Sequence, residues 1–448
     1  RDPEMSRGLG DVYKRQSVGS AQRMKDVAKL ITDGEQKIVV LSAMSGTTNT
    51  LVEISDYLYK KNPEGANEII NRLEAKYKQH IDELYSTEEY KQKTLDFVKS
   101  VFDYIRSYTK DIFTLFEEKV ILAQGEIIST NMVTNYLCEQ GVNATLIPAL
   151  EYMRTDKNSE PDLTYIREKL PAQLEANPGY EIYITQGFIC RNAYGEIDNL
   201  QRGGSDYTAS LIGAAINASE IQIWTDIDGM HDNDPRVVDK TSPVRQLHFE
   251  EAAELAYFGA KILHPTCIQP AKYANIPVRL LNTMEPTAPG TLISNDTEKG
   301  KIKAVAAKDN ITAIKIKSSR MLLAHGFLRK VFEIFESYQT PIDMVCTSEV
   351  GVSMSIDNTK HLNEIVNDLK KYGTVTVDHD MCIVCVVGDL EWENVGFEAK
   401  ALDAMREIPV RMISFGGSNY NISFLIRESD KKQALQSLSN VLFNGKEK

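Results

Sequence analysis

The 448-residue sequence has few cysteines and no excess of positive charge. Six cysteines in so long a chain do not form the dense framework of a disulfide-stabilised secreted domain. No apolar segment approaches the roughly 20 residues that a membrane-spanning helix requires. With 51 Lys and Arg against 63 Asp and Glu, the net charge is -12, which argues against a general binder of nucleic acid or anionic membranes. Because no signal-peptide pattern opens the chain, we expect a cytoplasmic protein with no nucleic-acid or membrane partner.

The cysteines and histidines also lack the spacing of a metal site. Cys382 and Cys385 form a CxxC pair, but they lie in the apolar run 381–387, where a strand would direct them to opposite faces. The seven histidines are scattered along the chain. We therefore expect these two cysteines to pack in a core rather than to bind a metal.

The stretch 183–234 carries the strongest indication of a ligand site. An apolar strand stops at Gly187, and the loop that follows ends in the motif RGGSD at 202–206, directly before a helix. Adjacent glycines let the backbone approach an anion, and the first N–H groups of the helix point at it. Arg202 offers a planar fork for a carboxylate or phosphate, and Asp206 a partner for an ammonium group. A glycine turn with a surface salt bridge is the alternative for the motif taken alone.

Polar residues follow two further strands. A strand at 221–224 ends in Thr225-Asp226, and Asp234-Pro235-Arg236 comes shortly after. Another strand at 38–41 leads into the hydroxyl-rich loop SAMSGTTN at 42–49. The carboxyl ends of parallel strands are where such sheets bind ligands, so both loops are candidates for holding phosphate or carboxylate oxygens. For the second loop, an ordinary strand-to-helix connection with a helix cap remains the alternative.

The segments between these motifs are mainly helical. Residues 51–120 show two apolar stripes at helical spacing, which we interpret as core packing. Glu126 is expected in the first turn of a helix within 121–137, where a carboxylate would interact with the helix dipole. Lys261 follows a glycine break and is either a ligand of a nucleotide phosphate or a solvated lysine.

The C-terminal third repeats one plan twice. Gly326 opens a helix that is followed by strands at 341–345 and 352–356, and Gly396 opens a second helix with strands at 409–413 and 422–426. Positions 326 and 396 lie 70 residues apart, so two small α+β units of matching plan are expected. Neither copy has a catalytic constellation, which suggests ligand sensing or subunit contact.

With these residues in view, the chain resembles aspartokinases over nearly its whole length, in particular the monofunctional, lysine-sensitive type. The matching motifs occur in the family's order and spacing: VVLSAMSGTTN from Val39, GEIIST from Gly125, QGFI with RGGSDYTA, WTDIDG, DPRVV, FGAKILHP from Phe258 and TSEVGVSMSID from Thr347. The resemblance implies an α/β protein: an amino-acid-kinase αβα sandwich followed by two α+β ACT domains of ferredoxin-like plan.

The expected domains follow from this resemblance. They are a leader of non-native appearance at 1–16, a catalytic domain at 17–297, a first ACT domain at 298–378 and a second at 379–448. In the family the first ACT unit is inserted into the second, which would let the strand near 304–307 pair with the C-terminal unit.

The resemblance also implies the reaction. The family transfers the γ-phosphoryl group of ATP, with Mg²⁺, to the side-chain carboxylate of L-aspartate, giving 4-phospho-L-aspartate on the way to lysine, threonine and methionine. Arg202 should clamp the substrate α-carboxylate, and Asp206 and Glu126 should surround its ammonium group. The other residues matching the substrate site are Ser42, Thr48, Gly203, Gly204 and Ser205. Those matching the nucleotide site are Thr225, Asp226, His231, Arg236 and Lys261, and no metal ligand is carried over.

Feedback inhibition by L-lysine is implied as well. The residues that match the family's lysine-binding segments in the first ACT unit are Met321, Phe327, Leu328, Ile342, Asp343, Thr347, Ser348 and Glu349. Asp343 and Glu349 suit the two ammonium groups of lysine, although a solvated acid at a strand end would explain each of them. Because ACT units usually join through their sheets, a homodimer or homotetramer is expected.

One departure from the family is serious. Its opening motif KFGGTSV supplies a lysine for the transferring phosphoryl group, but here Val12 stands at the lysine's position, and Lys14 and Arg15 replace the two glycines. Such a cation is worth about 3–4 kcal/mol, or two to three orders of magnitude in rate. We therefore expect weak or absent activity, with an artificial leader in place of the native first strand as its cause. The alternatives are a catalytically inactive lysine sensor and another amino-acid kinase, such as a glutamate kinase.

Overall fold

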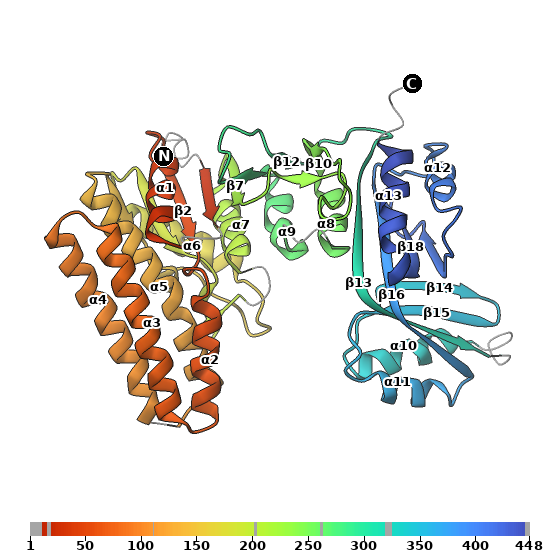
Figure 1. Ribbon diagram of the computed structural model, residues 1–448, viewed down its shortest axis with the longest axis horizontal. Helices are drawn as coiled ribbons and strands as arrows, with labels where there is room; N and C mark the ends of the chain where they lie inside the picture. The colour runs from red at the N-terminus through yellow and green to blue at the C-terminus, as the bar shows by residue number, and fades with distance from the viewer. Residues whose placement is uncertain are drawn as a thin grey trace. The chain divides into compact units, whose positions relative to one another are not determined.

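The computed structural model describes residues 11–15, 19–110, 112–200, 204–259, 263–318 and 325–443, with only the backbone described for 11–15. The chain divides into two compact units (Figure 1). The first comprises Arg1–Gly229 and Leu263–Asn295, and the second comprises Met230–Ile262 and Asp296–Lys448.

A twisted sheet forms the centre of the first unit. Its strands lie in the order β12 (Thr291–Ser294), β11 (Val278–Asn282), β7 (Glu220–Thr225), β1 (Asp11–Arg15), β2 (Lys37–Leu41), β4 (Ile182–Gln186) and β3 (Ala144–Leu146). All neighbouring pairs are parallel except β11 with β12. Every residue of β2 and β4 is buried, as expected for strands covered on both faces. The short strands β5 (Ile189–Arg191) and β6 (Ile197–Asn199) pair with each other.

Strand β1 differs from the sequence expectation. Residues 1–16 showed no strand periodicity, yet Asp11–Arg15 pairs with β2 on one side and β7 on the other. Main-chain pairing to two neighbours does not depend on an alternating side-chain pattern, so hydrophobic periodicity could not predict this strand.

Helices cover the sheet of the first unit. They are α1 (Ala21–Ile31), α2 (Thr47–Tyr59), α3 (Pro63–Leu84), α4 (Glu88–Ser107), α5 (Leu115–Glu139), α6 (Leu163–Ala176), α7 (Gly204–Ile216) and α9 (Pro265–Ala274). Figure 1 shows α2 to α5 as long helices lying side by side. The apolar stripe of α3, including Ile69, Leu73 and Tyr77, is buried in one large core cluster, so the predicted packing role is confirmed.

Glu126 does not lie in a first turn, as the sequence suggested, but in the middle of α5. The helix begins at Leu115, where Thr114 and Glu117 form a reciprocal capping box. This capping box lies upstream of residues 121–137, to which the sequence assigned the helix, so Glu126 is far from the helix end. Its side chain is buried.

The second unit is built on one antiparallel sheet. Its strands lie in the order β14 (Met344–Ser348), β15 (Gly351–Ile356), β13 (Ile302–Lys317), β16 (Thr374–Gly388), β18 (Asn421–Arg427) and β17 (Met412–Phe415). The helices α10 (Phe327–Ser337) and α11 (Leu362–Leu369) pack on one half, and α12 (Phe397–Ala404) and α13 (Lys431–Leu442) on the other. The unit also contains β8 (Met230–His231), β9 (Pro243–Val244), β10 (Gln246–His248) and α8 (Phe249–Tyr257).

The long strands β13 and β16 run through both halves (Figure 1). Residues 304–307 pair with residues 384–387, which form the C-terminal part of β16. Cys382 and Cys385 are fully buried in β16, which confirms the predicted core packing. In the part of the chain that the structure describes, no helix combines the length and apolarity needed to cross a membrane.

Candidate active site

Two loops and the first turn of a helix meet at the carboxyl edge of the sheet in the first unit. Strand β2 ends at Leu41 and β4 at Gln186, and the Gly187 N–H donates to the Leu41 carbonyl at 2.9 Å. A Cβ added to Gly187 would lie 2.3 Å from Ser205 Oγ and 2.8 Å from Ser205 Cα. Only a residue without a side chain therefore lets the β4 loop lie against the start of α7.

The start of α7 is brought to the loop after β2. Gly204 opens the helix with φ +41°, and Ser205 and Asp206 are buried in its first turn. Ser205 Oγ lies 3.1 Å from Ser42 Oγ, and Ser129 Oγ donates to the Ser42 carbonyl at 2.8 Å. The structure thus brings together four of the predicted substrate-site residues, whereas Arg202 and Gly203 lie outside the described residues.

Glu126 approaches the same loop from the middle of α5. Its Oε1 accepts from the Ala43 N–H at 3.3 Å, and its Oε2 is buried without a hydrogen-bond partner among the described residues. Burial raises the pKa of this carboxyl to about 7. The close approach requires Gly125, because a Cβ there would lie 2.9 Å from Ala43 Cβ. A buried acid with one unused oxygen is suited to receive a cationic group.

Thr48 lies half-buried in the first turn of α2, after Gly46 in a left-handed conformation. Its neighbour Thr47 contacts the Tyr77 hydroxyl at 2.9 Å, which fixes the beginning of this helix. The sequence analysis assigned no role to Ser129, which holds the Ser42 backbone. The i, i+3 spacing of Glu126 and Ser129 on one helix face was the available signal.

The residues matched to the nucleotide site divide between the two units. Thr225 is buried at the end of β7, where its hydroxyl bonds the backbone of Ile227, and Asp226 is exposed. In the second unit, His231 Nδ1 lies 2.9 Å from Thr241 Oγ1. Lys261 lies outside the described residues.

Arg236, also in the second unit, is not an open cation. Its guanidinium binds the Asp234 carboxylate through two hydrogen bonds, of 2.9 and 2.8 Å. Its side chain is 76% exposed, so the ion pair is weak and Arg236 can exchange Asp234 for another anion.

Asp343, the acid matched to a lysine effector, is held in a small network of the second unit. Its Oδ1 accepts from Tyr257 Oη at 2.9 Å and from Lys308 Nζ at 2.7 Å, and Lys308 also pairs with Asp357 at 3.0 Å. Its Oδ2 is buried without a partner in the described structure. Burial raises the pKa of Asp343, although the Lys308 ammonium opposes the shift. The sequence analysis missed Lys308, Tyr257 and Asp357, which lie far from Asp343 in the chain.

The other residues that match the family's lysine-binding segments lie near α10 and β14. Phe327 is buried at the start of α10 and Leu328 is exposed beside it. Ile342 is half-buried before β14, and Thr347, Ser348 and Glu349 are exposed at the far end of that strand. Met321 lies outside the described residues. The described part of the chain contains no group of three or more His, Cys, Asp or Glu side chains able to hold a metal ion.

Comparisons with known proteins agree with this architecture. The amino acid kinase family model matches residues 16–282, and an ACT domain model matches residues 384–442. The chain is 34% identical to chloroplastic aspartokinase 1 of Arabidopsis thaliana, over 95% of this chain and 79% of that protein. It is 31% identical to lysine-sensitive aspartokinase 3 of Escherichia coli strain K12, over 92% of this chain and 94% of that protein.

Solved structures give the same result. E. coli aspartokinase III in complex with aspartate and ADP superimposes with a TM-score of 0.83 at 30% identity, covering 97% of this chain and all of that one. The complex of the same enzyme with lysine and aspartate gives 0.81 at 31% identity, covering 97% and 99%. The chain therefore belongs to the amino acid kinase family, with a kinase domain followed by ACT structure as the sequence predicted. Within that family it is an aspartokinase.

The pKa of Glu126 predicts a pH-dependent stability difference. Because the folded state holds this proton more tightly than the unfolded chain, Glu126 lowers stability progressively as pH rises from about 4.5 through 7. We expect Glu126→Gln to match the parent at pH 4.5 and to exceed it by up to about 3 kcal/mol at pH 8. Urea unfolding of both proteins across this range measures the difference. Glu89→Gln, an exposed acid on α4, should show no such trend, and a constant difference for Glu126→Gln would contradict the assignment.

Proposed function

We propose that this aspartokinase transfers the γ-phosphoryl group of ATP to the side-chain carboxylate of L-aspartate, giving 4-phospho-L-aspartate. The observation that carries the proposal is the buried Glu126 carboxylate beside the loop after β2 and near the start of α7. Aspartate carries one ammonium group and two carboxylates, so its site needs both a buried acid and a group of anion-binding donors. E. coli aspartokinase III has been solved with aspartate and ADP, which supports the same substrate here.

Each substrate group has a candidate partner. The substrate ammonium group would bind Glu126 and Asp206, which would return the Glu126 carboxyl to its ionised form. The α-carboxylate would lie at the N-terminus of α7, where the backbone N–H groups and Arg202 favour an anion. The acceptor carboxylate would then face Ser42 and Thr48. These contacts hold the acceptor in place, which is most of what phosphoryl transfer requires of a protein.

In the first unit, Thr225 and Asp226 would contact the nucleotide, and His231, Arg236 and Lys261 remain nucleotide ligands on the family resemblance alone. The exposed Arg236 would exchange its partner Asp234 for a phosphate. Magnesium in phosphotransferases is bound largely by substrate phosphates and water, with one or two carboxylates at most. Magnesium bound in this way would neutralise charge on the phosphates.

We also propose that residues 12–16 impair the activity of this polypeptide. Strand β1 lies between β2 and β7, and Arg15 is in register with Leu41 and Trp224. The carboxyl end of β1 therefore lies at the same edge of the sheet as the candidate site. The family motif has a lysine and two glycines where this chain has Val12, Lys14 and Arg15. Of these, Arg15 lies at the carboxyl end of β1, whereas Val12 pairs with Ile38 and Ile221 near the start of the strand.

Lysine is proposed as the feedback inhibitor, bound by the first α+β half of the second unit. The buried Asp343 Oδ2 is available for an ammonium group, and the exposed Glu349 lies at the other end of β14. A complex of E. coli aspartokinase III with lysine is described as a T-state, which supports the assignment. If lysine binds a less active state preferentially, it shifts the equilibrium towards that state. The enzyme would act in the cytoplasm as a homodimer or homotetramer at the start of lysine, threonine and methionine synthesis.

Restoring the family motif tests the first-strand proposal. Replacing residues 12–16 with Lys-Phe-Gly-Gly-Thr should raise kcat for aspartate by two to three orders of magnitude, because the phosphoryl group regains its cation. A coupled assay of ADP release measures the change. Lys14→Gly with Arg15→Gly, which restores the glycines without the lysine, should recover much less. Lysine binding without any turnover after restoration would instead identify an inactive sensor.

The substrate assignment is tested in the restored protein. We expect aspartate to be phosphorylated in preference to glutamate, and Glu126→Gln to lower kcat/KM for aspartate about 10- to 100-fold through loss of a charged hydrogen bond. The Glu89→Gln control should leave kcat/KM unchanged. A preference for glutamate would establish the alternative amino-acid kinase.

The regulatory assignment is tested by calorimetric titration with L-lysine. Asp343→Asn should weaken lysine binding about 10- to 100-fold, because an amide replaces the carboxylate that pairs with the ammonium group. Asp403→Asn, at an exposed position of α12, is the matched control and should bind as the parent does. Unchanged affinity in Asp343→Asn would exclude this carboxylate as the lysine ligand.

A further inference from the structure

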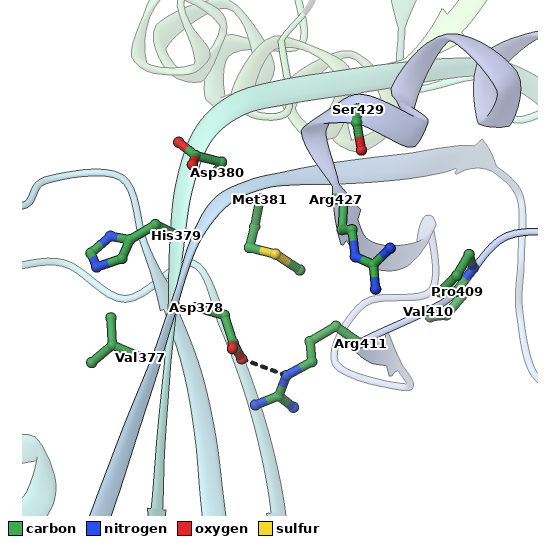
Figure 2. Close-up of a pocket in the computed structure, with 10 residues that line it drawn as sticks. All are labelled: Val377, Asp378, His379, Asp380, Met381, Pro409, Val410, Arg411, Arg427 and Ser429. Atoms are coloured by element: carbon green, nitrogen blue, oxygen red, sulfur yellow. Dashed lines mark hydrogen bonds and ion pairs between the residues drawn. The ribbon is translucent and has the colours of Figure 1, made fainter.

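A cavity of about 640 Å³ lies in the second unit where β16 passes from one half of the sheet to the other (Figure 2). Its wall combines residues of β16 with residues from the loop before β17 and from the end of β18. The charged and polar members are Asp378, His379, Asp380, Arg411, Arg427 and Ser429. None of these residues belongs to the proposed active site or to the proposed lysine site.

The two halves of the sheet repeat each other in register. Thr312 pairs with Ile356, and 70 residues later Cys382 pairs with Ile426. Ile311 pairs directly with Met381, its own counterpart at the same offset. The repeat therefore has a local twofold relation centred on this pair.

The backbone at the centre repeats as well. Asn310 and Asp380, again 70 residues apart, both adopt left-handed conformations, with φ of 60° and 54°. A structural feature in one half can consequently be matched to its counterpart in the other.

This correspondence shows that the cavity is a charge-inverted copy of the network around Asp343. Lys308 of the network around Asp343 corresponds to Asp378 of the cavity, and Asp357 corresponds to Arg427, both at an offset of 70. Arg411 precedes β17 as Asp343 precedes β14, and Met344 and Met412 start the two strands opposite Ser355 and Leu425. One cation between two acids in the network around Asp343 is thus replaced by Asp378 with two arginines at the cavity, whose wall also includes Asp380.

The two copies differ in how their charges are paired. In the first, Lys308 reaches both acids, at 2.7 and 3.0 Å. In the second, Asp378 Oδ2 accepts from Arg411 Nε at 2.8 Å, whereas Arg427 has no ion-pair partner among the described residues. Figure 2 shows both arginine side chains extending into the cavity from different elements. Two guanidinium groups in one cavity repel each other, and an anion between them would relieve that repulsion.

We propose that this cavity is a second ligand site, selective for a small dianionic molecule, either a dicarboxylate or one that carries a phosphate group. The planar donor forks of Arg411 and Arg427 suit either group. The ligand anion takes the place of Asp378 on Arg411 and engages Arg427 at the same time. The two halves of the regulatory sheet then accept ligands of opposite charge, and a cationic amino acid such as lysine is excluded from the second half. This inference does not depend on the proposed activity.

Calorimetric titration of the full chain at constant ionic strength tests the proposal. Inorganic phosphate and succinate are the two dianionic probes, and 1,5-diaminopentane is the cationic control. We expect at least one dianion to bind and Arg427→Gln to weaken that binding about tenfold, the scale of one charge-assisted hydrogen bond. Binding of phosphate alone or of succinate alone identifies the ligand class. No binding of either dianion, or equal affinity in Arg427→Gln, overturns the proposal.

Two further variants separate this site from general charge effects. Arg406→Gln removes an exposed arginine of the same half that pairs with Asp403 outside the cavity, and it should bind the dianion as the parent does. Asp378→Asn should bind the dianion more tightly, because Asp378 competes with the ligand for Arg411. Equal weakening in Arg406→Gln and Arg427→Gln, or weaker binding in Asp378→Asn, would contradict the proposed geometry.

Discussion

The parallel pairing of β1, β2, β4 and β7 is the constraint on which the first unit depends. In a parallel sheet every strand leaves at the same edge, so loops far apart in the chain are brought together there. The loop after β2, the loop after β4 and the first turn of α7 meet in this way, and two glycines permit the contact. Gly187 allows the β4 loop to lie against Ser205, and Gly125 allows α5 to approach Ala43. Neither contact would tolerate a side chain.

Within this arrangement Glu126 illustrates how a site can lower the stability of the protein that contains it. A carboxylate buried in the middle of α5, with one oxygen unused, is costly in the absence of a ligand. The same cost becomes binding selectivity when an ammonium group enters, because an uncharged analogue leaves the acid uncompensated. The proposed role in substrate binding would therefore account for a residue that packing alone would replace.

Motifs in the sequence were sufficient to predict the fold class, whereas the roles of the site residues stay predictions and part of their geometry was not foreseen. RGGSD and the loop SAMSGTTN could be placed at strand ends because glycine and hydroxyl residues follow short apolar runs. The position of Glu126 was misjudged, since the capping box at Thr114 and Glu117 lies eleven residues upstream of the GEIIST motif that drew attention to it. The partners of Asp343 could not be predicted, because Tyr257 and Lys308 reach it only through tertiary packing.

The 70-residue repeat could be recognised from the sequence, but the inversion of charge between its two copies could be recognised only from the strand register. The sequences around Lys308 and Asp378 share no pattern that would identify the two positions as equivalent. Only the pairing of β13 with β16 shows that they occupy equivalent places.

The length of β13 and β16 has a consequence for how the second unit forms. Residues 304–307 pair with residues 384–387, so this edge of the C-terminal half cannot form until residue 387 has been synthesised. Residues 312–378 can form the first half of the sheet before that point. The folded first half then holds the remaining parts of β13 and β16 near each other. Pairing residues 304–307 with 384–387 after the first half has folded costs far less chain entropy than pairing them across an unfolded loop.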